Sequence, residues 1–338
     1  MNILYLYKEE WEKEYISSQQ SVANIQFAKK FDDVPKEKMK ETEVLSVFVC
    51  HPVSKEILEK MPNLKLIATR STGFDHIDVT AAKEKGVEVV YVPSYGENTI
   101  AEFAFALLLA LSRKIPEARE QVTETGSFDQ SKLGGFDLKG KTIGIIGVGR
   151  IGTHAIKMAK GFDMKVVAYD PFPKQNLDQE LGFRYVDFEE LLGLSDVISL
   201  HASLSNSNRH MINAESIKHI KSGAVLINTA RGGLVQTNAL VKALEEGIIS
   251  AAGLDVLEEE GDMADETNLL DNPHPKLEEL KNVLANHYLI NHPRVIVTPH
   301  IAFNTKEAVK RILDTTMENI KSFANGEIKN KIPSSISK

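Results

Sequence analysis

Short apolar segments alternate with longer segments of helical character along most of the chain. Five apolar segments come first, and we expect them to be strands of a first α/β unit: residues 2–7, 24–28, 44–50, 64–70 and 87–92. We expect a second series of strands at residues 142–147, 165–170, 196–201, 223–229, 250–255 and 294–298. Strands that alternate with helices form parallel sheets with helices on their faces. The pattern therefore predicts an α/β protein with two doubly wound parallel sheets.

One helical segment lies between these series of strands, and another follows the second series. Residues 98–115 are apolar around most of a helix circumference, which predicts a helix buried between domains or subunits. Thr99 and Glu102 have the spacing of a capping box at its start. Residues 304–326 have a single apolar stripe, and we expect this helix to return and pack on the first unit.

A glycine-rich turn follows the predicted strand 142–147. Gly147, Gly149 and Gly152 form the pattern Gly-x-Gly-x-x-Gly, in which the glycines allow a tight turn, the approach of a pyrophosphate and close packing of the next helix. The N-terminus of that helix favours phosphate groups. Asp170 ends the next strand, about twenty residues later, where a carboxylate meets the ribose hydroxyls of the dinucleotide. A 2′-phosphate would be repelled there, so the motif predicts NAD as the cofactor.

Length and composition limit the class of protein. A chain of 338 residues is too long for one core, and 42% hydrophobic and 26% charged residues are typical of a globular protein. The net charge of −7 argues against a nucleic-acid partner. The N-terminus lacks a signal-peptide pattern, and the most apolar segment, 103–111, is too short to span a membrane. We expect a soluble cytoplasmic protein without a membrane partner, in which the single cysteine, Cys50, is a buried strand residue.

Polar side chains follow three neighbouring strands of the second series. Arg231 follows the strand 223–229, Asp255 ends the strand 250–255, and His300 follows the strand 294–298. Ligands of open α/β sheets bind beyond the carboxyl ends of the strands. The sequence therefore predicts a guanidinium, a carboxylate and an imidazole at one edge of a sheet.

Seven segments together resemble the D-isomer-specific 2-hydroxyacid dehydrogenase family, and within it the D-lactate dehydrogenases. They are RSTGFDHID, VPSYGENTIAEF, IGIIGVGRIG, VVAYDPF, INTARGGLV, AAGLDVLEEE and VIVTPHIAFNT, and the resemblance covers nearly the whole chain. The resemblance implies a Rossmann NAD-binding domain, residues 98–298, inserted in a flavodoxin-like substrate (catalytic) domain, residues 1–97 plus 299–338. It also implies an NAD-dependent oxidoreductase.

The resemblance also implies roles for individual residues. In the family that the chain resembles, the catalytic arginine follows Thr-Ala, the catalytic glutamate lies five residues beyond the aspartate of Leu-Asp-Val, and the catalytic histidine follows Thr-Pro. These positions hold the expected catalytic residues Arg231, Glu260 and His300. The expected cofactor-binding residues are Gly147, Gly149, Arg150, Ile151, Gly152, Asp170, Thr229, Ala230 and Asp255, the last near the nicotinamide carboxamide. The expected substrate-binding residues are Thr72 and Gly73, for the carboxylate, and Tyr95 and Phe303, for the side-chain pocket.

The chemistry of 2-oxo acid reduction needs these residue types. An imidazole at His300 can donate a proton to the developing alkoxide, and a carboxylate at Glu260 would stabilise the imidazolium. Arg231 can hold the substrate carboxylate and polarise the carbonyl. The neighbouring glutamates, Glu258 and Glu259, are expected to be solvated side chains.

The sequence leaves several alternatives open. We expect reversible reduction of pyruvate to D-lactate by a homodimer formed through residues 98–115 and their surroundings. A dehydrogenase for glyoxylate, hydroxypyruvate, or a phosphorylated or branched-chain acid is an alternative, and a non-catalytic NAD-sensing binding protein is another. The apparent insertion 261–293, with helical character around 275–289, has no assigned role. Its three histidines fit no usual zinc pattern, so we expect no metal.

Overall fold

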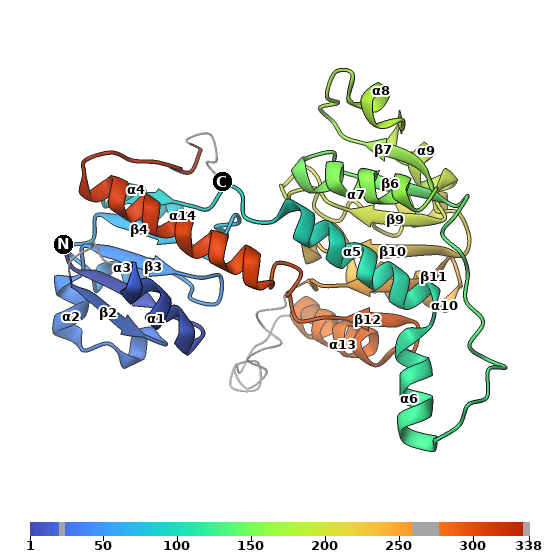
Figure 1. Ribbon diagram of the computed structural model, residues 1–338, viewed down its shortest axis with the longest axis horizontal. Coiled ribbons are helices and arrows are strands. Elements are labelled where there is room, and N and C mark those ends of the chain that lie inside the picture. The colour runs from blue at the N-terminus through green and yellow to red at the C-terminus, as the bar shows by residue number, and fades with distance from the viewer. Residues whose placement is uncertain (20–23, 259–276, 334–338) are drawn as a thin grey trace. The chain divides into compact units, whose positions relative to one another are not determined.

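The computed structural model describes residues 1–19, 24–258 and 277–333 of the chain (Figure 1). These residues form two compact units. Unit 1 contains Met1–Gly96 and the segment from Asn304 onward, and unit 2 contains Glu97–Phe303. In the described part of the chain, no helix is both long and apolar enough to cross a membrane.

Unit 1 is built on a five-stranded sheet with the strand order β2-β1-β3-β4-β5. Its strands are all parallel: β1 (Ile3–Leu6), β2 (Ile25–Ala28), β3 (Val44–Val47), β4 (Leu66–Thr69) and β5 (Glu88–Val90). Its helices are α1 (Glu10–Ser18), α2 (Lys36–Glu41), α3 (Lys55–Glu59), α4 (Val79–Glu84) and α14 (Lys306–Ala324). This order is that of the flavodoxin-like doubly wound fold.

Helices cover both faces of the unit 1 sheet. Buried residues of α2, α3 and α4 pack with one set of strand side chains, and those of α1 and α14 pack with the other. On α14, Leu313, Met317 and Ile320 contribute to this core, and the Thr305 side chain caps the helix by accepting a hydrogen bond from the Ala308 N–H. Helix α14 is thus part of the first unit, as the sequence predicted.

Unit 2 is built on a seven-stranded sheet with the order β12-β11-β10-β9-β6-β7-β8. The strands are parallel: β6 (Thr142–Ile146), β7 (Lys165–Tyr169), β8 (Arg184–Tyr185), β9 (Val197–Leu200), β10 (Ala224–Asn228), β11 (Ile249–Leu254) and β12 (Val295–Val297). The helices are α5 (Glu97–Ser112), α6 (Ile115–Thr125), α7 (Arg150–Gly161), α8 (Leu177–Leu181), α9 (Phe188–Leu194), α10 (Thr237–Glu245) and α13 (Leu277–Asn291). This is the Rossmann strand order with one further strand, so the predicted fold class is confirmed.

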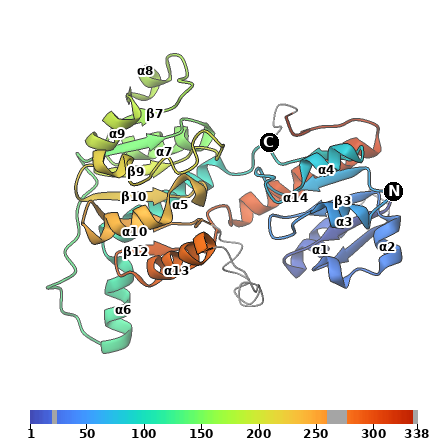
Figure 2. The ribbon, with the colours of Figure 1, turned by 180° about the vertical axis from the view of Figure 1, so that it is seen from behind.

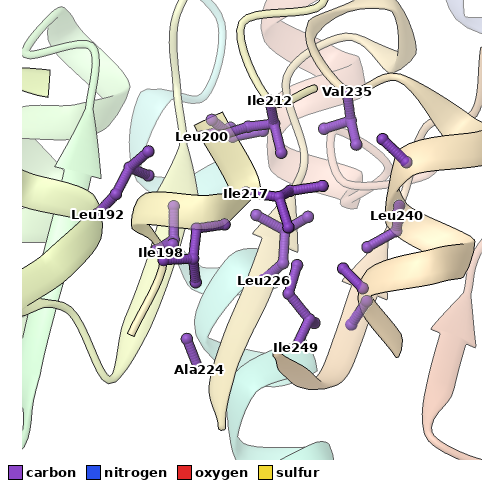
Figure 3. Packing of buried hydrophobic residues seen from close by; sticks show 14 of the residues in the cluster. Leu192, Ile198, Leu200, Ile212, Ile217, Ala224, Leu226, Val235, Leu240 and Ile249 are labelled. Carbon is purple, nitrogen blue, oxygen red and sulfur yellow. The ribbon is translucent and has the colours of Figure 1, made fainter. Parts of the chain in front are cut away.

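The unit 2 sheet also has a core on each face. Helices α5 and α7 cover one face, and α9, α10 and α13 cover the other, as the two opposite views show (Figures 1 and 2). Figure 3 shows the second core, in which Ile198 and Leu226 from the strands pack with Leu240 of α10. The burial of these apolar side chains holds the strand ends, and hence the loops that follow them, in place.

Three local predictions were wrong. Helix α5 begins at Glu97, so Thr99 lies inside the helix and is buried rather than capping its start. The helical segment also does not end at residue 115, because a second helix, α6, begins there after Lys114 in the left-handed conformation. Cys50 is exposed, since β3 ends at Val47 and the cysteine lies in the turn beyond it.

Candidate active site

The glycine turn of unit 2 has the geometry of a dinucleotide-binding loop. Gly147 has φ +94°, a conformation that favours glycine, and a Cβ there would lie 2.7 Å from the Ala202 nitrogen. A Cβ at Gly149 would meet nothing within 4 Å, which leaves open space beside the backbone. A Cβ at Gly152 would lie 2.0 Å from the Gly147 oxygen, so only glycine allows α7 to approach the turn. The three glycines therefore serve the turn, the ligand approach and the helix packing.

Asp170 lies directly after β7 and faces the backbone of this turn. Its Oδ2 accepts a hydrogen bond from the Val148 N–H at 2.7 Å, and its Oδ1 accepts one from the Phe172 N–H at 2.9 Å. The carboxylate is therefore held beside the glycine turn, where the ribose of a dinucleotide lies in this fold. Arg150, at the start of α7, forms an ion pair of 3.2 Å with Glu97, and Ile151 packs against the unit 2 core.

Two buried polar atoms lie just beyond the adjacent strands β9 and β10. They are Nδ1 of His201 and Oγ1 of Thr229, and within the described residues neither has a hydrogen-bond partner. The other ring nitrogen of His201 lies 2.9 Å from the Ser199 hydroxyl, and burial lowers the pKa of His201 to about 4. A buried polar group without a partner is costly unless a ligand or water completes it. Both atoms therefore fit a polar cofactor at this edge of the sheet.

Arg231 leaves the end of β10 in a turn that Asn228 holds. The Asn228 side chain donates to the Arg231 oxygen at 3.0 Å and accepts from the Ala230 N–H at 3.0 Å. The guanidinium donates to the Ala230 oxygen at 2.7 Å. These bonds set the direction in which the arginine side chain leaves the sheet edge.

His300 lies in a loop that Asp255 holds. The Asp255 carboxylate is buried, and it accepts hydrogen bonds from the Thr298 hydroxyl at 2.6 Å and from the Ile301 and Ala302 N–H groups at 2.9 and 2.8 Å. Burial raises the pKa of Asp255, and these three bonds oppose that effect. His300 itself has φ +52°, and its backbone N–H donates a hydrogen bond to the backbone oxygen of Asp255 at 2.9 Å. Asp255 therefore determines the course of the histidine loop.

The structure brings three of the predicted residues to one edge. Arg231, Asp255 and His300 follow β10, β11 and β12, which are neighbours in the sheet. Glu260 lies outside the described residues and stays a prediction. Glu258 was expected to be solvated, and this was wrong: it is 5% exposed and bonds to Arg209, His210 and Thr237.

Unit 1 presents the predicted carboxylate-binding turn. The Thr72 hydroxyl donates to the Val92 oxygen at 2.8 Å, and the Ser71 hydroxyl donates to the Gly73 oxygen at 2.6 Å, so side chains brace the turn on both sides. Tyr95 is half-buried, and its backbone oxygen accepts a hydrogen bond from Arg311 of α14. Phe303, also half-buried, belongs to unit 2.

Sequence reasoning missed several polar residues at the carboxyl edge of the unit 1 sheet. Arg70 is 2% exposed, and its guanidinium donates to Ser46 and to the Leu6 oxygen and lies 3.8 Å from the Glu12 carboxylate. His76 lies 3.1 Å from the Thr69 hydroxyl, and burial lowers its pKa to about 4. The position of Arg70 directly after the apolar run of β4 places it at the carboxyl edge of the sheet, but nothing local in the sequence indicates its burial.

These features define a class of protein: a Rossmann unit with a dinucleotide turn, and with Arg, Asp and His at its carboxyl edge, is that of a dinucleotide-dependent oxidoreductase. The family model of the D-isomer specific 2-hydroxyacid dehydrogenase NAD binding domain matches residues 105–302. The chain belongs to this family.

Relatives agree with this assignment. The chain is 42% identical to a glyoxylate reductase of Thermococcus litoralis over 86% of this chain and 83% of the reductase. It is 37% identical to the D-lactate dehydrogenase of Escherichia coli over 84% of both chains. A solved structure of D-lactate dehydrogenase from Aquifex aeolicus, complexed with NAD and lactic acid, superimposes with a TM-score of 0.84, at 35% identity and over 98% of this chain and 100% of that one.

NAD is accordingly the cofactor, and a small 2-hydroxy or 2-oxo acid is the substrate class. The glycine turn would hold the pyrophosphate, Asp170 the adenosine ribose, and the buried Thr229 and His201 atoms the polar groups further along the edge. In the described part of the chain, no group of three His, Cys, Asp or Glu side chains has the arrangement of a metal site.

Proposed function

We propose that this protein catalyses the reversible NADH-dependent reduction of pyruvate to D-lactate. The observation that carries the proposal is the placement of Arg231 and His300 after neighbouring strands of the sheet that bears the dinucleotide turn. When bound, the reduced cofactor supplies the hydride. The residues of the chain then have to bind the acid, orient its carbonyl and move one proton.

Each of these tasks has a candidate residue. Arg231 binds the substrate carboxylate and draws negative charge toward the carbonyl oxygen, since a guanidinium keeps its charge at every working pH. His300 donates a proton from its ring to the developing alkoxide, and it takes a proton back in the oxidation direction. Glu260 is proposed to stabilise the charged imidazole. Thr72 and Gly73 are proposed to bind the carboxylate through their backbone N–H groups, and Tyr95 and Phe303 to contact the substrate side chain.

A second candidate function is the reduction of glyoxylate or hydroxypyruvate. The relative at 42% identity is a glyoxylate reductase, which favours this alternative. Tyr95 and Phe303 argue against a phosphorylated acid, because neither aromatic side chain can neutralise a phosphate. A panel of pyruvate, 2-oxobutyrate, phenylpyruvate, hydroxypyruvate and glyoxylate, followed by NADH absorbance, decides between them. A kcat/KM for pyruvate below that for glyoxylate would overturn the first assignment in favour of the second.

Arg231→Lys tests the enzymatic function itself. An ammonium keeps the charge but lacks the planar pair of donors that matches a carboxylate, so KM for the oxo acid should rise and kcat should fall. The affinity for NADH should stay within about twofold, since the cofactor contacts lie elsewhere. Arg294→Lys is the matched control. Arg294 precedes β12, at the edge of the sheet opposite to Arg231, and its guanidinium donates to the Leu244 backbone oxygen. A normal Arg231→Lys enzyme would exclude Arg231 as the substrate-binding group, whereas an unmodified protein that reduces none of the oxo acids would favour the NAD-sensing alternative.

We also propose that the protein is a cytoplasmic homodimer. Helix α6 has no buried residue, and Ile115, Val122 and Phe128 on and after it are 55%, 40% and 83% exposed. An apolar surface of this kind is typical of an interface between subunits. Val122→Glu with Phe128→Glu should convert the dimer to a monomer in light scattering, and an unmodified protein that is already monomeric would contradict the proposal.

A further inference from the structure

Glu258 is a buried carboxylate at the centre of a polar cluster in unit 2. Its side chain is 4% exposed, and its Oε1 lies 3.0 Å from Nη2 of Arg209 and accepts a hydrogen bond from Nε2 of His210. Its Oε2 accepts a hydrogen bond from the Thr237 hydroxyl at 3.1 Å. We call Arg209, His210, Thr237 and Glu258 the Glu258 cluster.

The cluster joins segments that are far apart in the sequence. Arg209 and His210 lie between β9 and β10, Thr237 begins α10, and Glu258 follows β11. Helix α13 is attached as well, because the buried Asn286 side chain donates to the Glu258 backbone oxygen at 2.8 Å. One carboxylate therefore fixes the positions of several loops at the edge that carries the candidate catalytic residues.

Arg231 is connected to this cluster through the residue that follows it. A Cβ at Gly232 would lie 2.0 Å from the Leu257 oxygen and 2.5 Å from the Glu258 nitrogen, so the two backbones are in direct contact. The backbone N–H of His210 also donates a hydrogen bond to the backbone oxygen of Gly233 at 2.8 Å. A cavity of about 10 Å³, the size of one water molecule, lies beside Gly232, Thr237 and Glu258. A shift of the Leu257–Glu258 peptide must therefore move the Arg231 turn.

The charge of Glu258 is what makes the arrangement specific. A buried carboxylate is tolerated only when it is paired and hydrogen-bonded, and removal of its charge breaks the pairing with Arg209. A glutamine at this position has one acceptor oxygen, whereas Glu258 accepts bonds at both oxygens. With its oxygen toward Arg209 and His210, the amide turns its own donors toward the Thr237 backbone N–H, which lies 3.5 Å from Oε2, although the Thr237 hydroxyl can turn and accept one of them. The opposite orientation turns these donors toward Arg209 and His210. The loops that meet at Glu258 lose the single position that the carboxylate imposes on them.

We propose that Glu258 is a positioning residue that holds Arg231 in the orientation needed to bind the substrate carboxylate. The inference rests on the proposed role of Arg231 in catalysis. It assigns to Glu258 no contact with substrate or cofactor, because its two oxygens are already engaged by the Glu258 cluster.

A double-mutant cycle between Glu258→Gln and Arg231→Lys tests this proposal. The full-length enzyme with NADH is assayed against pyruvate and against glyoxylate. Glu258→Gln alone should raise KM for the oxo acid and lower kcat/KM by about ten- to a hundredfold, because a small displacement of a binding group has effects of this size. In the Arg231→Lys background, the same substitution should lower kcat/KM by less than about threefold, since the misplaced group is already gone. The KM for NADH should stay within about twofold in all variants.

Two further variants keep the test decisive. Arg209→Gln removes the ion pair with Glu258 by changing the more exposed partner, because the Arg209 side chain is 52% exposed. This variant should fold even where Glu258→Gln does not, and it should raise KM for the oxo acid in the same way. Glu246→Gln is the matched control, because Glu246 is an exposed glutamate at the end of α10. It should leave both kinetic constants unchanged.

The outcomes separate this inference from the proposed function. A normal Arg231→Lys enzyme overturns the proposed role of Arg231 and this inference with it, whereas an unmodified protein that reduces none of the oxo acids overturns the proposed function. An impaired Arg231→Lys enzyme combined with normal Glu258→Gln and Arg209→Gln enzymes overturns the positioning role alone. Equal losses from Glu258→Gln in both backgrounds, or a loss confined to NADH binding, also overturn it, because Glu258 would then act on something other than Arg231.

Discussion

Replacing Asp255 by asparagine tests whether this carboxylate holds the His300 loop in its catalytic position. The carboxylate accepts three hydrogen bonds from that loop, two at Oδ1 from Thr298 and Ile301 and one at Oδ2 from Ala302. An asparagine side chain has almost the same shape, but only one of its two terminal atoms accepts hydrogen bonds. The substitution therefore changes hydrogen bonding and charge while it leaves the packing volume unchanged.

The structure sets the size of the effect. The best amide orientation keeps the Thr298 and Ile301 bonds and turns its NH₂ group toward the N–H of Ala302, a residue that is 4% exposed. Loss of one hydrogen bond to a charged acceptor, with a buried donor left unpaired, costs about 2–3 kcal/mol in the free energy of unfolding. The loop must also shift to relieve the contact between two donors. A displacement of about 1 Å at His300 lowers kcat about a hundredfold.

Two measurements on the same protein test this reasoning. Urea unfolding gives the change in free energy, and the decay of NADH absorbance with saturating pyruvate gives kcat. Thr298→Val is the matched control: it removes one donor and leaves both N–H bonds to Asp255, so it should cost about 1 kcal/mol and lower kcat by less than about tenfold. A destabilised Asp255→Asn enzyme with normal kcat would refute the positioning argument. A defect confined to NADH affinity would instead support the predicted contact with the nicotinamide carboxamide.

Three further predictions follow from other residues of unit 2. The unmodified enzyme should prefer NADH to NADPH by at least about tenfold in kcat/KM, and Asp170→Ala should narrow the preference; equal use of both cofactors before mutation would contradict this. His300→Ala should lower kcat by about 10²–10⁴-fold at every pH, and a smaller loss would exclude it as the proton donor. Burial holds the pKa of His201 near 4, below its ordinary 6.5, so its contribution to stability is full above about pH 6.5 and is lost as pH falls toward 4. At about pH 5 the loss is about 2 kcal/mol, and His201→Gln should abolish it in urea unfolding; an unchanged pH dependence would show that His201 is not buried in its neutral form.

The dinucleotide turn was predictable from the sequence because its requirements are local. Each glycine answers a backbone need within a few residues: the positive φ at Gly147, the open space at Gly149 and the contact of Gly152 with the Gly147 oxygen. The placement of Arg231 and His300 was predictable for a related reason. Parallel strands all end at one edge, so residues that follow successive strands come together without any knowledge of their partners.

Burial of charged residues was not predictable in this way. Glu258 lies in a run of three glutamates, and nothing in that run distinguishes a buried carboxylate from a solvated one. Its partner Arg209 is 49 positions away, and the two meet only because β9 and β11 lie on either side of β10. Arg70 is a similar case, since its contacts with Leu6 and Ser46 depend on the strand order β1-β3-β4. A local pattern cannot contain information of this range.

The two buried carboxylates of the segment from Asp255 to Glu258 bind loops on opposite sides of β11. Asp255 binds the loop after β12, which carries His300, and Glu258 binds the loops around β10, which carry Arg231. In the proposed mechanism, neutralising Asp255 disturbs the proton donor and should lower chiefly kcat, whereas neutralising Glu258 disturbs the carboxylate-binding group and should raise chiefly KM for the oxo acid. Asp255→Asn and Glu258→Gln lie three positions apart on the same backbone segment, and both replace a buried carboxylate by an amide. A contrast between their kinetic constants therefore reflects geometry rather than a general loss of stability. One short segment after β11 is thus bonded to both the loop of His300 and the loops around Arg231, the two groups that the proposed reaction uses.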